Sequence, residues 1–244
     1  MLDEPNLHAV YAYNTRTWEE YPKLRPLPIG LKWNWKSTRL FSEGKMEKKS
    51  EVSTIAASPD ESKELFEAKR GNHSIFLRHL TGRKLGRKWQ ITNVALGTKR
   101  EDIGEILNST APLNLVMTGG GMMGRKEYFE ELKKHRFVVC PPGGGLDTHC
   151  TWEAFIAGTI PILPTSSLDP QFEGLPVWLV SDWNEVTDEA AKEKSEELAS
   201  MRFNWKMAYA VGWKEIGYAE GLCEPNRSLS DGIIQRDVAI STFS

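Results

Sequence analysis

Short apolar runs alternate with amphipathic stretches along most of the chain from Trp89 onward. The apolar runs predict strands at 89–96, 113–118, 137–140, 160–163 and 177–180, and the stretches between and after them predict helices at 100–107, 126–135, 148–157, 185–201 and 204–219. Alternation at these lengths is typical of parallel strands joined by covering helices. The predicted fold class is therefore α/β, a Rossmann-like parallel sheet with helices on both faces. Ligands of such sheets lie at the carboxyl ends of the strands.

The pattern is weaker in the first third of the chain. Residues 7–13 alternate like a short strand, and Pro26-Leu-Pro-Ile-Gly30 predicts an extended connection, because each proline disfavours the helical conformation of the residue before it. Residues 42–70 are mostly polar, with a short exposed helix expected at 61–69. We therefore expect a polar linker at 42–70, a ligand-binding domain at 71–222 and a tail at 223–244.

Composition narrows the class of partner. The 31 Lys and Arg residues nearly balance the 33 Asp and Glu residues, so no overall field favours nucleic acid. No apolar run approaches the roughly 20 residues that span a bilayer, so we expect no membrane span and a soluble chain. The 3 cysteines are too few for a disulfide framework and favour a reducing compartment, whereas sequons at Asn72, Asn108 and Asn226 keep a secretory route open.

The segment from Phe137 to Leu163, F-V-V-C-P-P-G-G-G-L-D-T-H-C-T-W-E-A-F-I-A-G-T-I-P-I-L, carries most of the chemistry. A strand stops at two prolines, and three glycines remove every Cβ from the following turn. Asp147 or Thr148 can then cap a helix whose free amide groups face the loop. A helix amino terminus beside bare backbone is a favourable site for a diphosphate.

Glu153 lies in the second turn of that predicted helix, and Gly158 is expected to end the helix in the left-handed conformation. A carboxylate at this place can accept hydrogen bonds from two adjacent sugar hydroxyls, as an acidic residue does for ribose in dinucleotide-binding folds. The alternative is that Glu153 is a solvated carboxylate on the helix surface with no ligand. For Arg100, at the start of another helix, a solvated role weighs at least as much as a ligand contact.

These motifs resemble the donor-site signature of exostosin-like glycosyltransferases. The match is strong from about residue 136 to residue 187, including Leu175-Pro-Val-Trp-Leu-Val-Ser-Asp-Trp-Asn-Glu-Val-Thr187, and weaker at Leu27-Pro-Ile-Gly30 and Thr98-Lys-Arg100. The resemblance implies a GT-B arrangement with the nucleotide on the carboxy-terminal domain. Residues 1–41 would then be a remnant of the acceptor-side domain and the crossing segment, since relatives carry most of that domain further upstream.

The implied activity is transfer of a sugar from a nucleoside diphosphate donor to a glycan or protein-linked acceptor, with no tightly bound metal and no other cofactor. The compartment would be the cytoplasm, or the Golgi lumen if an anchor precedes the chain. The donor-binding residues implied are Arg100, Gly143, Gly144, Gly145, Asp147, Thr148, His149 and Glu153. Relatives usually have arginine where this chain has Cys150, and we name no catalytic base.

Three other interpretations compete with this one. Gly119-Gly-Gly-Met-Met-Gly124 fits a dinucleotide fingerprint, but the next strand ends at Cys140-Pro141 without the required acid, and Arg125 stands where a phosphate loop needs lysine. A metal or thiol site at Cys140, His149 and Cys150 lacks ligand spacing, so both cysteines are predicted to be buried small hydrophobes. A nucleotide-binding chain without turnover is the third. Trp183, Trp205 and Trp213 are expected to be packing anchors.

Overall fold

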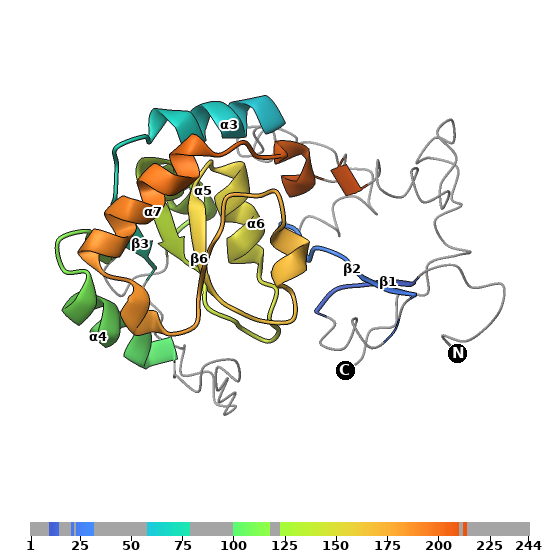
Figure 1. The fold of residues 1–244 in the computed structure, drawn as a ribbon, viewed down its shortest axis with the longest axis horizontal. Helices are drawn as coiled ribbons and strands as arrows, with labels where there is room; N and C mark the ends of the chain where they lie inside the picture. The colour runs from blue at the N-terminus through green and yellow to red at the C-terminus, as the bar shows by residue number, and fades with distance from the viewer. Residues whose placement is uncertain are drawn as a thin grey trace.

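The computed structural model of the protein describes residues 10–14, 21, 23–31, 58–78, 100–117, 123–209 and 212–213 (Figure 1). Its centre is a sheet of five parallel strands in the order β4-β3-β5-β6-β7. The strands are β3 (Ile75–Leu77), β4 (Leu115–Met117), β5 (Phe137–Val139), β6 (Ile160–Pro164) and β7 (Trp178–Val180). The predicted α/β, Rossmann-like fold class is confirmed.

The strand order reverses direction between β3 and β5. From β3 the chain passes through a helix to β4 at one edge, and then returns to β5 on the other side of β3. At such a reversal the two loops leaving the carboxyl ends diverge, and the crevice between them is where open α/β sheets bind ligands. The loop that follows β5 is the glycine segment singled out in the sequence.

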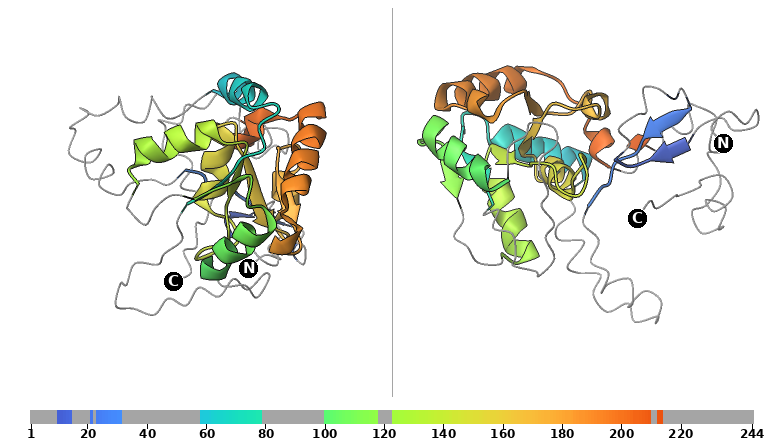
Figure 2. Two further views of the ribbon diagram at one scale, coloured as in Figure 1. Left: turned by 90° about the vertical axis from the view of Figure 1, so that its left-hand side faces the viewer. Right: turned by 90° about the horizontal axis from the view of Figure 1, so that it is seen from below.

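Helices cover both faces of the sheet (Figures 1 and 2). On one face α4 (Arg100–Thr110) and α7 (Asp188–Ser200) pack on Ile75, Leu77 and Phe137. On the other face α5 (Arg125–Lys134) and α6 (His149–Ile156) pack on Phe76 and Val138. Successive residues of a strand point to opposite faces, so β3 and β5 must be apolar throughout to serve both layers.

Helix α3 (Pro59–Ala68) confirms the helix expected at 61–69, but it is not an exposed one. Phe66 is fully buried in the core, and Ser62 donates a hydrogen bond to Ile156 O at 2.7 Å. The packed unit therefore includes residues that the sequence assigned to a linker. Ser58 begins the helix by accepting from Glu61 N, which satisfies one of the free amide groups of the first turn.

Two short parallel strands, β1 (Val10–Ala12) and β2 (Leu24–Pro26), form a separate pair beside the sheet (Figure 1). β1 lies inside the strand predicted at 7–13. β2 leads into Leu27 and Ile29, and this extended segment docks on the glycine loop. The docking brings a part of the chain more than a hundred residues upstream into contact with the segment of interest.

Most predicted elements from residue 100 to residue 201 are confirmed with ends shifted by a few residues, and 3-10 turns lie at η2 (Asp169–Phe172), η3 (Trp183–Glu185) and η4 (Trp205–Ala208). The helix predicted at 204–219 is wrong over its first part, because η4 ends at the extended residue Tyr209. The strand predicted at 89–96 and the predicted tail lie outside the described residues. Within the described part of the chain, no helix is long and apolar enough to cross a membrane.

Candidate functional site at the β5–α6 loop

The loop between β5 and α6 begins in the core and emerges at the surface. Cys140, Pro141 and Pro142 are buried, and Gly144 is exposed. Thr148 is the N-cap of α6, in an extended conformation, but its side chain makes no capping hydrogen bond to the helix. The amide groups of the first turn therefore receive no side-chain acceptor at the cap, which leaves room for a ligand to supply one.

The three glycines differ in what surrounds them. A Cβ at Gly143 or Gly144 would meet no atom within 4 Å, so the backbone borders open space there. A Cβ at Gly145 would collide with the side chain of Asn14, whose Oδ1 accepts a hydrogen bond from Asp147 N at 2.6 Å. Gly143 and Gly144 thus fit a cradle for a ligand, whereas Gly145 is required by the close approach of the upstream segment.

Asp147 is a buried structural anchor rather than a wall of an open pocket. Its side-chain oxygens accept hydrogen bonds from Ile29 N at 2.7 Å, Trp152 Nε1 at 2.8 Å and Gln171 Nε2 at 3.2 Å. Burial raises the pKa of this carboxyl group, and these hydrogen bonds oppose the rise. Removing the carboxylate would leave three donors without their acceptor, at a cost of about 1–3 kcal/mol for each one that stays buried.

His149 and Thr148 are also tied to the protein. His149 Nδ1 lies 2.8 Å from Gly30 O, within hydrogen-bond distance, and so fixes the end of the docking segment. Thr148 Oγ1 lies 3.3 Å from Thr151 Oγ1, one turn along α6. Of the residues predicted to line the donor pocket, Asp147 and His149 hold the upstream segment in place, while Thr148 remains half-buried beside the loop.

Glu153 is buried and paired with an arginine, so the alternative of a helix carboxylate exposed to water is wrong. Its side chain is 9% exposed, and Oε1 lies 3.5 Å from Nη1 of Arg125, the first residue of α5. A buried carboxylate requires a partner, and Arg125 is one. The separation is longer than that of a close charge-assisted hydrogen bond, and the Arg125 side chain is 40% exposed, so this partner can move toward a ligand.

Tyr128 and Arg78 complete the surroundings of the loop. The Arg78 guanidinium lies 5.1 Å from the centroid of the Tyr128 ring, and Tyr128 OH donates to Cys150 Sγ at 3.6 Å. Burial raises the pKa of Tyr128, and the charge of Glu153 adds to the rise, so the phenol stays a neutral donor. Arg78 immediately follows β3, and so it lies at the carboxyl edge beside the reversal in strand order.

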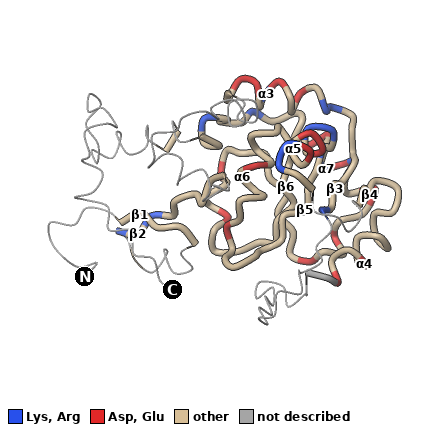
Figure 3. Tube along the Cα trace, turned by 180° about the vertical axis from the view of Figure 1, so that it is seen from behind, with Lys and Arg blue, Asp and Glu red and all other residues tan. Residues whose placement is uncertain are grey.

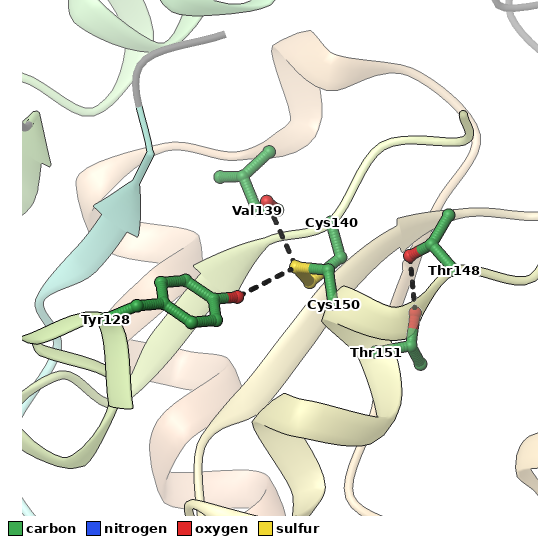
Figure 4. The surroundings of a disulfide bond; sticks show 6 residues. All are labelled: Tyr128, Val139, Cys140, Thr148, Cys150 and Thr151. Carbon is green, nitrogen blue, oxygen red and sulfur yellow. Dashed lines mark hydrogen bonds between the residues drawn. A yellow bond between two sulfur atoms is a disulfide. The ribbon is translucent and has the colours of Figure 1, made fainter. Parts of the chain in front are cut away.

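Cys140 and Cys150 form a disulfide, with Cα atoms 5.6 Å apart (Figure 4). The interpretation of both cysteines as small buried hydrophobes, outside any disulfide framework, is therefore wrong. The bond links the end of β5 to the first turn of α6 and spans the whole glycine loop, which chain separation alone did not reveal. The sulfur of Cys150 faces Tyr128 and lies 3.9 Å from Val139 O, so position 150 directs no group with a charge at the loop.

Two predicted features are only partly described. Arg100 is the first residue of α4, which places its backbone at the carboxyl edge on the opposite face of the sheet; its side chain lies outside the described part. In the alternative fingerprint at 119–124, residues 119–122 also lie outside it, and Gly124 is the extended N-cap of α5. The described residues contain no group of three His, Cys, Asp or Glu side chains that could hold a metal.

The tryptophans predicted to be packing anchors occupy that role. Trp183 is 1% exposed and Trp205 is 6% exposed, and Trp213 packs on the core beside Trp152. The buried rings of Trp183 and Trp205 are closed to a sugar, and Trp213 is half-buried.

A cavity of about 200 Å³ lies at the other end of the sheet. It is lined by Arg70, Gly71, Ser195, Glu196, Ala199 and Ser200. These residues precede β3 or end α7, so they lie at the amino edge of the strands, away from the crevice that parallel sheets use. Arg70 is also engaged there, with Glu67 Oε2 and Ala199 O as acceptors. We therefore place the candidate site at the β5–α6 loop.

Basic and acidic positions are interspersed over the described helices rather than gathered on one face (Figure 3). The fold and the loop define an α/β protein with a candidate anion-binding site at the carboxyl edge of its sheet. No protein-family model and no curated protein matches the chain.

Proposed function

We propose that the chain binds a nucleoside diphosphate sugar at the β5–α6 loop and provides the donor side of a glycosyltransferase. The single observation that carries the proposal is the position of this loop. It leaves the sheet where the strand order reverses, borders open space at Gly143 and Gly144, and leads directly into α6 and Glu153. The resemblance of residues 136–187 to the exostosin-like donor signature supports the same assignment.

The chemistry would be attack by a hydroxyl of a glycan or protein-linked acceptor on the anomeric carbon of the sugar, with the hydroxyl proton released to solvent as the new bond forms. The bond from that carbon to the diphosphate oxygen breaks, and the departing diphosphate gains negative charge. The amide groups at the start of α6 face this charge and would stabilise it. Glu153 would accept hydrogen bonds from the two ribose hydroxyls, which fixes the nucleoside and so positions the bond that breaks.

A chain that binds nucleotide without turnover is the second candidate. Its support is Cys150, which as part of a disulfide brings no charge to a place where the resemblance implies arginine. An assay for hydrolysis or transfer of the bound donor sugar separates the transferase from a chain that only binds nucleotide. Release of free sugar from the donor, or its transfer to an added glycan, favours the transferase. Saturable binding without either favours the second candidate.

The binding test is calorimetric titration of the purified chain with UDP, GDP and their common sugar conjugates. We expect one nucleotide series to bind, and Glu153→Ala to weaken that binding about tenfold or more, because two hydrogen bonds to a charged acceptor are lost. Glu193→Ala, which removes an exposed carboxylate on α7, is the matched control and should bind as the wild type does. Binding unchanged in Glu153→Ala would remove Glu153 from the site.

A further inference from the structure

Two arginines from different elements, Arg78 and Arg125, lie at the carboxyl edge of the sheet against neighbouring rings of α5. Arg78 directly follows β3, and Arg125 opens α5, the helix that leads into β5. Both belong to the face covered by α5 and α6, since Arg78 follows Phe76 by two residues and Phe76 packs on that face. Neither was predicted as a ligand residue from the sequence.

Both guanidinium groups are held against aromatic rings of α5. Arg78 Cζ is 5.1 Å from the centroid of Tyr128, and Arg125 Cζ is 5.5 Å from that of Phe129. A guanidinium that rests on a ring keeps its five N–H donors in its own plane, where they can form paired bonds with phosphate oxygens. Attraction to the ring also limits the conformations of the side chain, which lowers the entropy that binding must remove.

A diphosphate bound beside Glu153 requires positively charged side chains to balance its negative charge. A nucleoside diphosphate brings about two to three negative charges, and Glu153 adds another. Helix amides offer only about half a positive charge. Cys150, which lies beside Tyr128, is uncharged in its disulfide.

We propose that Arg78 and Arg125 bind the diphosphate of the donor at this crevice, in place of the cation that position 150 does not supply. This proposal rests on the proposed function and names the residues that take the charged half of the substrate. In the free protein Arg125 is paired with Glu153. On binding, Arg125 turns to the phosphate and Glu153 to the ribose, so the ligand replaces an internal ion pair with two external contacts.

The test compares Arg78→Gln, Arg125→Gln and the control Arg202→Gln, an exposed arginine just beyond the end of α7. Each is titrated with UDP, UMP, uridine and inorganic pyrophosphate, and with the guanine series, using ligand-observed NMR for the weak ligands. We expect each crevice variant to lose about tenfold in affinity for the diphosphate and for pyrophosphate. The uncharged nucleoside should bind within twofold of the wild type, and Arg202→Gln should bind every ligand as the wild type does.

The outcomes separate this proposal from the function on which it rests. Unchanged diphosphate affinity in both crevice variants overturns the assignment of the arginines and leaves the nucleotide site standing. An equal loss for nucleoside and diphosphate also overturns it, because the arginines then shape the pocket without contacting phosphate. Wild-type protein that binds pyrophosphate but no nucleotide keeps the anion site and removes the donor function. Thermal unfolding of each variant identifies any that fails to fold, and Arg125→Lys then replaces Arg125→Gln.

Discussion

The two ends of α6 use the same residue types for opposite purposes. At its amino end, Gly143 and Gly144 border open space, and Arg125, the ion-pair partner of Glu153 in the second turn, is partly exposed. At its carboxyl end, Gly158 touches α3, and the nearest basic group, Lys69, is buried with Ala157 O and Thr159 Oγ1 as acceptors at 3.0 and 2.7 Å. Glycine and a cation therefore indicate a ligand only where space and free hydrogen-bonding capacity remain.

The largest expected effect on stability comes from replacing the glycine at the carboxyl end of α6 with alanine, compared with the same replacement at its amino end. Gly158→Ala should destabilise the fold by about 3 kcal/mol or more, because φ is +61° there and a Cβ would lie 2.6 Å from Phe66 N and Ser62 O. Gly144→Ala should change the free energy of unfolding by less than about 0.5 kcal/mol and weaken nucleotide binding. Chemical denaturation and titration of both variants measure the contrast. Equal destabilisation by the two would contradict it.

The disulfide at the amino end comes next in size. Reduction should lower the free energy of unfolding by about 3 kcal/mol, since it releases the constraint on a loop with a sequence separation of 10. Because the bond spans the glycine loop, reduction should also weaken nucleotide binding. Denaturation with and without a phosphine reductant checks the stability, with Cys140→Ser plus Cys150→Ser as the reductant-independent comparison. A wild type unaffected by reductant while free-thiol titration shows two new thiols would exclude this role.

Much of the local structure around α6 could be predicted from the sequence. Residues 137–163 gave the strand, the turn, the helix and its left-handed end, because each depends on local apolar spacing, proline and glycine. β3 was missed because Ile75-Phe76-Leu77 is too short to stand out, and its strand structure comes from pairing with β4 and β5. The buried state of Asp147 was missed because its donors Ile29 and Gln171 come from distant segments.

The smallest expected effect, taken per pH unit, is a dependence of the free energy of unfolding on pH that arises at the carboxyl end of α6. Burial, followed by the charges of Arg136 and Lys133, lowers the pKa of Lys69 from 10.5 to about 6 in the folded protein. Between these values the unfolded chain holds a proton that the folded protein has lost, so stability rises with pH across this window and falls as pH drops toward 6. The slope from this group is at most about 1.4 kcal/mol per pH unit.

Lys69→Met should flatten that slope while leaving nucleotide affinity unchanged, because the residue lies at the end of α6 away from the glycine loop. Urea denaturation of both proteins between pH 6 and pH 9 measures the difference. The same slope in the variant and the wild type would assign the pH dependence to other groups.

The central claim is that the ligand binds at the amino end of α6. It does not bind at the opposite edge of the sheet, where residues 195–200 line the cavity. Hydrogen–deuterium exchange of the intact chain, with and without saturating UDP or GDP, tests it most directly, because it reports protection at each segment. We predict slower exchange across residues 143–153 and around Arg125, with residues 195–200 unchanged. Saturable binding that leaves residues 143–153 unprotected, or that protects residues 195–200 instead, would contradict the account.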